Sequence, residues 1–180
     1  MNGNKLFTAE DIDAAVEKIA SDIGAEFKGD FSDCALVGIH NQGVPFAQLI
    51  CESLRKKYGT APLLGKLDIS MYRDDIGTKK SLPPIRETLI PFDINDGIVI
   101  LTDDVLQTGR TIRAALDAIT DYGRPALIRL AVLVDRGLRE FPIRADYTGA
   151  VIEAPADERL RTAWAEYNED DAVYSVPQHS

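Results

Sequence analysis

Three short apolar runs limit most strongly what this chain can fold into. They are Cys34–Ile39, Ile98–Thr102 and Leu127–Val134, and nearly every residue in each is hydrophobic. A run of this length without alternation is typical of a strand that is buried on both faces, as in a parallel sheet covered by helices. Segments with helical spacing lie between the runs. The sequence therefore predicts an α/β fold with a mostly parallel central sheet.

Three helices are predicted before and between these strands. The first begins at Thr8, whose side chain suits the N-cap position. The second carries Pro45 in its first turn, where a helix tolerates proline, and Gly59 and Gly123 end the second and third helices. The residues expected to face inward recur at helical spacing: Ile12, Val16, Ile19 and Ile23; Phe46, Leu49, Ile50 and Leu54; and Ile112, Ala115, Leu116 and Ile119.

Two further strands are predicted, over about residues 63–72 and 147–152. After the first of them, the segment 73–91 carries two lysines, three prolines and no clear period. A stretch of this length without a pattern is more often a functional lid than part of the core. We therefore expect a flexible loop at about 73–91, within a single domain that spans residues 1–180.

Composition limits the classes of function. With 20 basic and 29 acidic residues the net charge is -9, which argues against non-specific binding to nucleic acid, because such binding needs a basic face. No apolar run approaches the ~20 residues of a membrane helix, and no apolar signal segment precedes the first helix. We therefore expect a cytoplasmic protein that does not bind membranes. Cys34 and Cys51 lie in apolar segments, which indicates buried, reduced thiols.

The strongest chemical signal follows the strand at 98–102. Asp103 and Asp104 stand at the end of that strand, where adjacent carboxylates can accept hydrogen bonds from two vicinal hydroxyls or hold a hydrated divalent cation. The sequence Thr-Gly-Arg-Thr at 108–111 then opens a helix, whose free amides and positive dipole end suit a phosphate. A ribose 5-phosphate would satisfy both features at once.

These residues carry a family resemblance. The segment Val99–Thr111 resembles the phosphoribosyl pyrophosphate (PRPP) motif of the type I phosphoribosyltransferases. The stretches 67–75, 124–125 and 131–149 extend the likeness to the PyrR family, whose members are pyrimidine-operon attenuators and uracil phosphoribosyltransferases. The resemblance implies the type I phosphoribosyltransferase fold, which has a mostly parallel central sheet flanked by helices, a small hood and a flexible loop.

The resemblance also implies a reaction and a site. Uracil and PRPP would give UMP and pyrophosphate, with Mg²⁺ bound mainly through PRPP, in a homodimer or larger homo-oligomer. No metal ligand in the protein itself is certain. By this resemblance the ribose hydroxyls would be bound by Asp103 and Asp104, and the 5-phosphate by Gln107, Thr108, Gly109, Arg110 and Thr111. The pyrophosphate loop would consist of His40, Asn41, Gln42 and Gly43. The base and nucleotide pocket would contain Asp135, Arg136, Tyr147 and Thr148, and the flexible loop would contribute Lys79 and Arg86.

The chain departs from the family pattern at the pyrophosphate loop. That pattern is Gly-Ile-basic-Thr-Arg-Gly, often beside a non-proline cis peptide, whereas residues 38–43 read Gly-Ile-His-Asn-Gln-Gly. Both formal positive charges are lost unless His40 is protonated. This predicts a weakened enzyme rather than an inactive one, because the backbone amides would remain. Gln107 and Asp135 replace an acid and a lysine of similar purine enzymes, which favours a pyrimidine base.

Two other functions are compatible with the sequence. Family members also bind a messenger-RNA leader when UMP or UTP is present, so one alternative is a UMP/UTP-responsive, RNA-binding regulator of pyrimidine-operon transcription with weak or no turnover. The other is a nucleotide sensor without turnover, which the altered loop at 38–43 suggests. The segments that form the RNA surface in the family carry few cations here. The first helix offers Glu17, Lys18 and Ser21, and the later segments have Leu138 and Ala150, although Arg139 and Arg144 remain.

Overall fold

The fold is built around a parallel sheet of five strands. The computed structural model describes residues 3–74, 86–153, 155 and 157–177. Every neighbouring pair of strands in the central sheet is parallel, as the sequence predicts. In spatial order the strands are β3 (Leu63–Leu67), β2 (Cys34–Ile39), β4 (Ile98–Leu106), β5 (Leu127–Asp135) and β6 (Tyr147–Val151).

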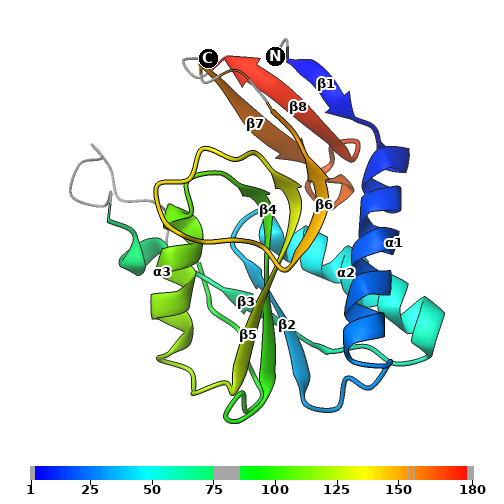
Figure 1. Cartoon of the computed structure of the whole chain (residues 1–180), viewed down its shortest axis with the longest axis vertical. Helices are drawn as coiled ribbons and strands as arrows, with labels where there is room; N and C mark the ends of the chain where they lie inside the picture. Colours follow the sequence, from blue (N-terminus) through cyan, green and yellow to red (C-terminus); the bar gives the residue numbers. More distant parts are fainter. Residues whose placement is uncertain (1–2, 75–85, 154, 156, 178–180) are drawn as a thin grey trace.

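Helices cover both faces of this sheet. Figure 1 shows α1 (Ala9–Glu26) and α2 (Gly43–Tyr58) on one side and α3 (Arg110–Ile119) on the other. Because successive side chains of a strand point to opposite faces, each central strand contributes to two apolar cores. Leu36 of β2 packs with α1 and α2, whereas the next residue, Val37, packs with α3. The continuous hydrophobic runs of the sequence are explained by this burial on both faces.

A second, smaller sheet forms the hood that the family resemblance implies. Its strands are antiparallel and lie in the order β1 (Asn4–Phe7), β8 (Ala172–Pro177) and β7 (Glu158–Ala163). Figure 1 places this sheet beyond one end of the central strands, with both chain termini beside it. The hood joins residues from the two ends of the chain, since Asn4 pairs with Ser175.

Two predicted strand boundaries are wrong. The strand at 63–72 ends at Leu67, because the Asp68 carboxylate accepts hydrogen bonds from the backbone N–H and the hydroxyl of Ser70, at 2.8 and 2.6 Å. Residues Ser70–Tyr72 form a 3-10 helix instead, labelled η1. In contrast, β4 continues past residue 102 to Leu106, because it goes on pairing with β5 after its other neighbour, β2, has ended.

Most of the helix predictions hold. Thr8 is the N-cap of α1, and it exchanges hydrogen bonds with Asp11 in a capping box. Leu116 was expected to face inward but is 36% exposed, because the buried side of α3 passes through Ala115 instead. Cys34 and Cys51 are buried, unpaired cysteines, and burial raises the pKa of Cys34 to about 12.

The expected flexible loop falls largely on residues 75–85, which lie outside the described part of the chain, as does Lys79. The part that follows it returns to the sheet, where Leu89 exchanges two backbone hydrogen bonds with Lys66. No helix in the described ranges is long and apolar enough to cross a membrane.

Candidate functional site

The loop that follows β2 packs against the neighbouring strand β4. The hydroxyl of Thr102, which is fully buried in β4, donates to the carbonyl oxygen of Gly43 at 3.1 Å. A Cβ at position 43 would stand 2.2 Å from the Thr102 carbonyl oxygen, so only glycine permits this approach. The loop at 40–43 is thus held against the strand that carries the acid pair. In open α/β sheets this edge is where ligands bind.

The acid pair lies within β4 rather than at the junction of strand and loop that the sequence predicts. Asp103 is buried, whereas Asp104 is partly exposed. Burial, followed by the neighbouring Asp104 carboxylate, raises the pKa of Asp103 well above its ordinary value. Asp104 accepts a hydrogen bond of 2.5 Å from the hydroxyl of Thr162, on strand β7 of the hood. The pair therefore combines a desolvated carboxyl with one that faces open space and is tied to the hood.

A hollow follows the acid pair at the N-terminus of α3. Gly109, the N-cap of α3, has φ of +89°, which favours glycine, and a Cβ there would lie 3.2 Å from Phe141. The hollow has a volume of about 220 Å³. It brings together part of the acid pair, the loop at 107–111 and one hood residue; its lining is Asp104, Val105, Leu106, Gln107, Thr108, Gly109, Thr111, Ile112 and Leu160.

Arg110, the fifth residue that the resemblance assigns to the phosphate, turns its side chain elsewhere. Its guanidinium forms ion pairs with Asp74 at 2.6 Å and Glu140 at 2.5 Å, and it does not line the hollow. The backbone N–H of Arg110 donates to the hydroxyl of Thr108 at 3.3 Å. Its contribution to this loop is therefore made by the main chain.

The loop after β2 contains the cis peptide expected from the family pattern, between His40 and Asn41. Burial lowers the pKa of His40 below its ordinary value of 6.5, so the ring is neutral at pH 7. One ring nitrogen, Nε2, lies 3.3 Å from the carbonyl oxygen of Glu87. Neither charge of the family pattern is restored at neutral pH. Gln42 is the N-cap residue of α2, and its side-chain Oε1 is buried with no hydrogen-bond partner among the described residues.

Two residues approach this loop from other parts of the chain. The hydroxyl of Tyr167, in the short helix η2 (Ala165–Tyr167), donates to the carbonyl oxygen of Asn41 at 3.2 Å. The Arg86 side chain is exposed, and its positive charge adds to the effect of burial in lowering the pKa of His40. Burial and the Glu166 carboxylate raise the pKa of Tyr167, and the charge of Arg86 opposes this rise. The charge of Arg86 therefore lies near His40 and Tyr167.

The residues after β5 are placed at the same edge. The Asp135 carboxylate accepts hydrogen bonds from Arg139 at 2.5 Å and from the Gly137 amide at 2.9 Å. Burial alone would raise the pKa of Asp135, but these hydrogen bonds outweigh it and the pKa is lowered. Arg136 is 4% exposed and donates to the carbonyl oxygen of Pro155 at 2.5 Å. Its Nε has no partner among the described residues.

Tyr147, which the resemblance assigns to the base pocket, has its side chain in the core. It begins β6 and pairs with Ala131, so it lies part-way down the sheet, and its ring is 4% exposed in the core beneath α1. Its hydroxyl donates to Glu26 at 2.5 Å, and burial raises its pKa. Thr148, the next residue, is joined to α1 through its carbonyl oxygen, which accepts from Lys18 at 2.6 Å.

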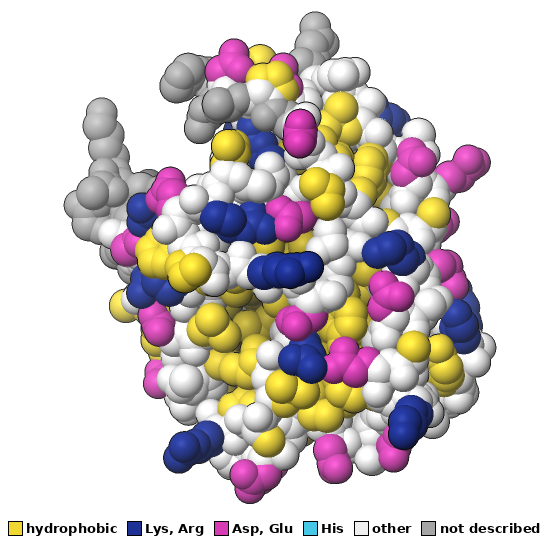
Figure 2. Space-filling model, viewed as in Figure 1, with side chains coloured by type: hydrophobic (Ala, Val, Ile, Leu, Met, Phe, Trp, Pro, Cys, Tyr) yellow, Lys and Arg dark blue, Asp and Glu magenta, His cyan; other side chains and the backbone are white. Residues whose placement is uncertain are grey.

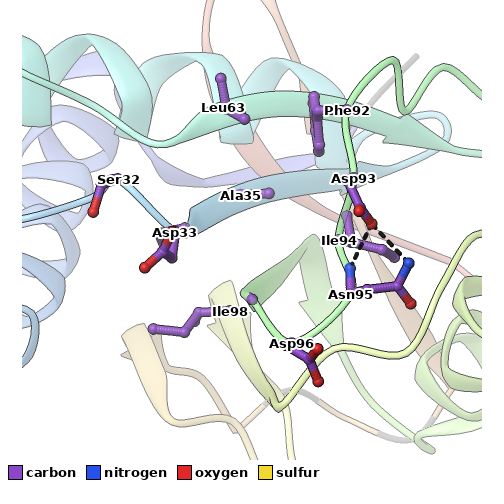
Figure 3. A pocket seen from close by; sticks show the side chains of 12 residues that line it. Ser32, Asp33, Ala35, Leu63, Phe92, Asp93, Ile94, Asn95, Asp96 and Ile98 are labelled. Carbon is purple, nitrogen blue, oxygen red and sulfur yellow. Dashed lines mark hydrogen bonds between the residues drawn. The ribbon is translucent and has the colours of Figure 1, made fainter.

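Another hollow lies at the other end of the central strands, where their amino ends are. Figure 3 shows Asp33, Asp93 and Asp96 around it, near the amino ends of β2 and β4. Its volume is about 300 Å³, and both nitrogens of Asn95 donate to Asp93. It shares no lining residue with the hollow beside α3. None of the predicted site residues lies in it.

Three residues that touch the site were not predicted. Thr162 lies in strand β7 of the hood and Tyr167 in η2, where no sequence motif marked a function. Arg139 was assigned to an RNA surface, but its guanidinium points into the molecule and binds the loop at 106–107, with 2.7 Å to the Gln107 carbonyl oxygen. The Arg-Gly-Leu-Arg sequence at 136–139 was the available signal for it, because it adjoins a predicted site residue.

Known proteins resemble the chain both in sequence and in structure. The family model for the phosphoribosyl transferase domain matches residues 4–161. "Bifunctional protein PyrR" of Roseiflexus sp. is 49% identical over 90% of this chain and 88% of its own length. The protein of the same name from Chloroflexus aurantiacus is 45% identical over 96% of this chain and 94% of its own length.

Solved structures of purine enzymes share the fold. A hypoxanthine-guanine phosphoribosyltransferase of Bacillus anthracis has a TM-score of 0.72 at 20% identity, and the match covers 98% of this chain and 99% of that one. The hypoxanthine phosphoribosyltransferase of Trypanosoma cruzi has a TM-score of 0.71 at 21% identity, over 97% and 96% of the two chains. At these identities the likeness concerns the fold alone. The sequence relatives carry the closer assignment, and the chain belongs to the PyrR family of phosphoribosyltransferases.

Proposed function

We propose that the protein transfers the ribose 5-phosphate group of PRPP to uracil, giving UMP and pyrophosphate. The observation that carries the proposal is the juxtaposition at one sheet edge of the acid pair Asp103 and Asp104 with the hollow at the N-terminus of α3. The close relatives named "Bifunctional protein PyrR" support it. In the reaction a bond forms between N1 of uracil and C1 of the ribose, the bond from C1 to pyrophosphate breaks, and N1 loses its proton.

Each part of the site would act on one part of PRPP. The acid pair would accept hydrogen bonds from the two ribose hydroxyls, and the amides of the 107–111 loop would bind the 5-phosphate. The loop at 40–43 would bind the pyrophosphate through its backbone, because His40 is neutral at pH 7. With few charges aimed at the leaving group, positioning of PRPP supplies much of the rate acceleration.

The preference for a pyrimidine follows from two side chains. Gln107 cannot take a proton from a purine nitrogen, as the acid at this position of similar purine enzymes could. Asp135 adds no donor for a purine exocyclic oxygen, because an ionised carboxylate only accepts hydrogen bonds, here from Arg139 and Gly137. Arg136 would contribute to the nucleotide pocket through its buried Nε.

Mg²⁺ would be bound mainly through PRPP. In the described residues no group of three or more His, Cys, Asp and Glu side chains comes together to hold a metal ion. A pair of carboxylates fits the way in which Mg²⁺ is usually held, by one or two protein carboxylates, phosphate oxygens and water. Asp104, which is partly exposed, would contact the hydrated ion. The ion would supply positive charge beside the phosphates.

A second role is favoured by the word "bifunctional" in the names of the relatives. It is regulation of pyrimidine-operon transcription through an RNA leader, in response to UMP or UTP. The face of the molecule drawn in Figure 2 offers little support for this role. Figure 2 shows Lys and Arg side chains mixed with Asp and Glu on one face, without a large basic patch. Arg139 adds little to such a surface, because five groups inside the protein accept its hydrogen bonds.

A turnover assay tests the proposed activity. The protein is incubated with PRPP, Mg²⁺ and one base at a time: uracil, hypoxanthine, guanine or orotate. We expect UMP from uracil and no comparable product from the other three. Turnover of hypoxanthine at a rate similar to that of uracil would overturn the assignment of the base. Binding of UMP without turnover of any base would favour the nucleotide sensor.

A further inference from the structure

One arginine binds the backbone of the loop at 106–108, which lines the hollow beside α3. Arg139 lies in the segment between β5 and β6, and 24% of its side chain is exposed. Its guanidinium donates to five groups in all. These are the carbonyl oxygens of Gln107 at 2.7 Å, Ile143 at 2.8 Å, Gly137 at 3.0 Å and Leu106 at 3.4 Å, and the Asp135 carboxylate at 2.5 Å.

These contacts determine which way the loop amides point. The carbonyl oxygens of residues 106, 107 and 108 all accept hydrogen bonds from the segment 136–141: Leu106 from Arg136 and Arg139, Gln107 from Arg139, and Thr108 from the amides of Glu140 and Phe141. The one cis peptide of the described chain is elsewhere, so these peptides are trans. In a trans peptide the N–H points away from the C=O.

The N–H groups of Gln107, Thr108 and Gly109 therefore point away from the segment 136–141. All three residues line the hollow beside α3. Within the described ranges none of these three amides donates a hydrogen bond to the protein. Three successive free amides on one side of a loop form a binding site for an anion, and here the opposite side of the loop is fixed.

We propose that Arg139 is a positioning residue for the 5-phosphate: by binding the carbonyl side of the 106–108 loop, it directs the amides of that loop at the phosphate. The proposal rests on the proposed function for the identity of the ligand. Only arginine suits the place, because its planar guanidinium offers five donors in a fixed fork, whereas lysine offers one charge centre. Arg139 also joins this loop to Asp135, so the phosphate loop and the end of β5 are held as one unit.

The test measures phosphate-dependent binding by calorimetry. The variants are Arg139→Gln and Arg139→Lys, and the ligands are UMP, ribose 5-phosphate and uridine, which lacks the phosphate. We expect affinity for UMP and ribose 5-phosphate to fall between about tenfold and about 100-fold, as misplaced groups typically cost. Affinity for uridine should change less than about twofold. Arg144→Gln, which removes the same charge at an exposed position of the same segment, should leave all three affinities unchanged.

A merely structural role would give a different pattern. If Arg139 only supported the fold, UMP and uridine affinity would fall together and the melting temperature would fall in parallel, which would overturn the proposal. Unchanged UMP affinity in both variants would overturn it as well. Should Arg139→Gln fail to fold, Arg139→Lys, which keeps the charge and loses the fork, decides the question.

The measurements distinguish a failure of the proposed function from a failure of the Arg139 proposal. A wild-type protein that binds ribose 5-phosphate but makes no UMP from uracil contradicts the proposed reaction. The Arg139 proposal would then still stand or fall on the binding of ribose 5-phosphate by the variants. A wild-type protein that binds neither UMP nor ribose 5-phosphate would contradict both.

Discussion

The hydroxyl of Thr162, on strand β7 of the hood, donates a hydrogen bond of 2.5 Å to the carboxylate of Asp104, on strand β4 of the central sheet. Thr162 is 2% exposed, so this bond is shielded from water. It joins two sheets that share no strand pairing. The hood is thereby tied to a residue that we assign to the ribose, and the orientation of Asp104 depends on the hood.

Replacing Thr162 tests this dependence. Thr162→Val keeps the shape of the side chain and removes the donor, whereas Thr162→Ser keeps the donor. A hydrogen bond to a charged group contributes about 1.5–3 kcal/mol. We therefore expect UMP affinity to fall about tenfold or more in the valine variant and to stay near wild type in the serine variant. Equal affinities for the two variants in calorimetry would show that Thr162 does not orient Asp104.

The Asp103 carboxylate should destabilise the folded protein at neutral pH, although it is needed for binding the ribose. Its pKa is raised in the folded protein, mainly by burial and then by Asp104. An acid whose pKa is higher folded than unfolded binds more protons in the folded state, so stability falls as pH rises between the two values. Asp103→Asn should therefore melt at a higher temperature than wild type at pH 7 and bind UMP more weakly.

The gain in melting temperature should shrink as pH is lowered and vanish below the ordinary carboxyl range, where Asp103 is protonated in both states. Asp117→Asn is the matched control, because the Asp117 side chain is 55% exposed in a surface ion pair and its removal changes stability little. A lower melting temperature for Asp103→Asn than for wild type at pH 7 would contradict a destabilising Asp103 carboxylate.

The central sheet was predictable because burial on two faces leaves a clear pattern. The strand Cys34–Ile39 was located to the residue from its apolar run, and the acid pair with the Thr-Gly turn marked the site. Hood strands leave no such pattern. β1 and β7 are short and partly exposed, and the partner of β1, β8, lies at the far end of the chain. Pairings so distant in sequence have no local signal.

The direction in which individual side chains point could not be predicted from the sequence either. Tyr147 was expected at the base pocket, but an aromatic residue at the start of a strand packs equally well on either face, and here Glu26 of α1 accepts its hydroxyl. Arg139 could not be placed for a similar reason. Its partners are mainly backbone carbonyl oxygens, which every residue possesses, so nothing in the residue types indicates the contact.

His40 should titrate below the ordinary range of histidine. Burial lowers the pKa of His40 below its ordinary value of 6.5. The chain has two histidines, so the NMR signals that disappear in His40→Asn are those of His40. We expect a titration midpoint below 6.5 for His40 in the protein without ligand. A midpoint at or above 6.5 would mean that this loop keeps a positive charge near neutral pH.

Gly43 should be intolerant of any side chain. In Gly43→Ala the new Cβ would lie 2.2 Å from the Thr102 carbonyl oxygen, so the loop at 40–43 must move away from β4. We expect the KM for PRPP to rise while affinity for UMP, which has no pyrophosphate, changes much less. Steady-state kinetics and calorimetry on the same preparation separate the two effects. A parallel loss of both would indicate general disruption of the sheet edge.

The initial rate of UMP formation from uracil and PRPP, measured for the wild type and for Asp103→Asn/Asp104→Asn, tests the central claim most directly. The claim is that the acid pair and the hollow beside α3 form the PRPP site of a uracil phosphoribosyltransferase. It predicts UMP formation by the wild type and a rate at least about 100-fold lower in the double variant, whose folding is checked by circular dichroism. Absence of UMP with the wild type, or an unchanged rate in a folded double variant, would contradict it.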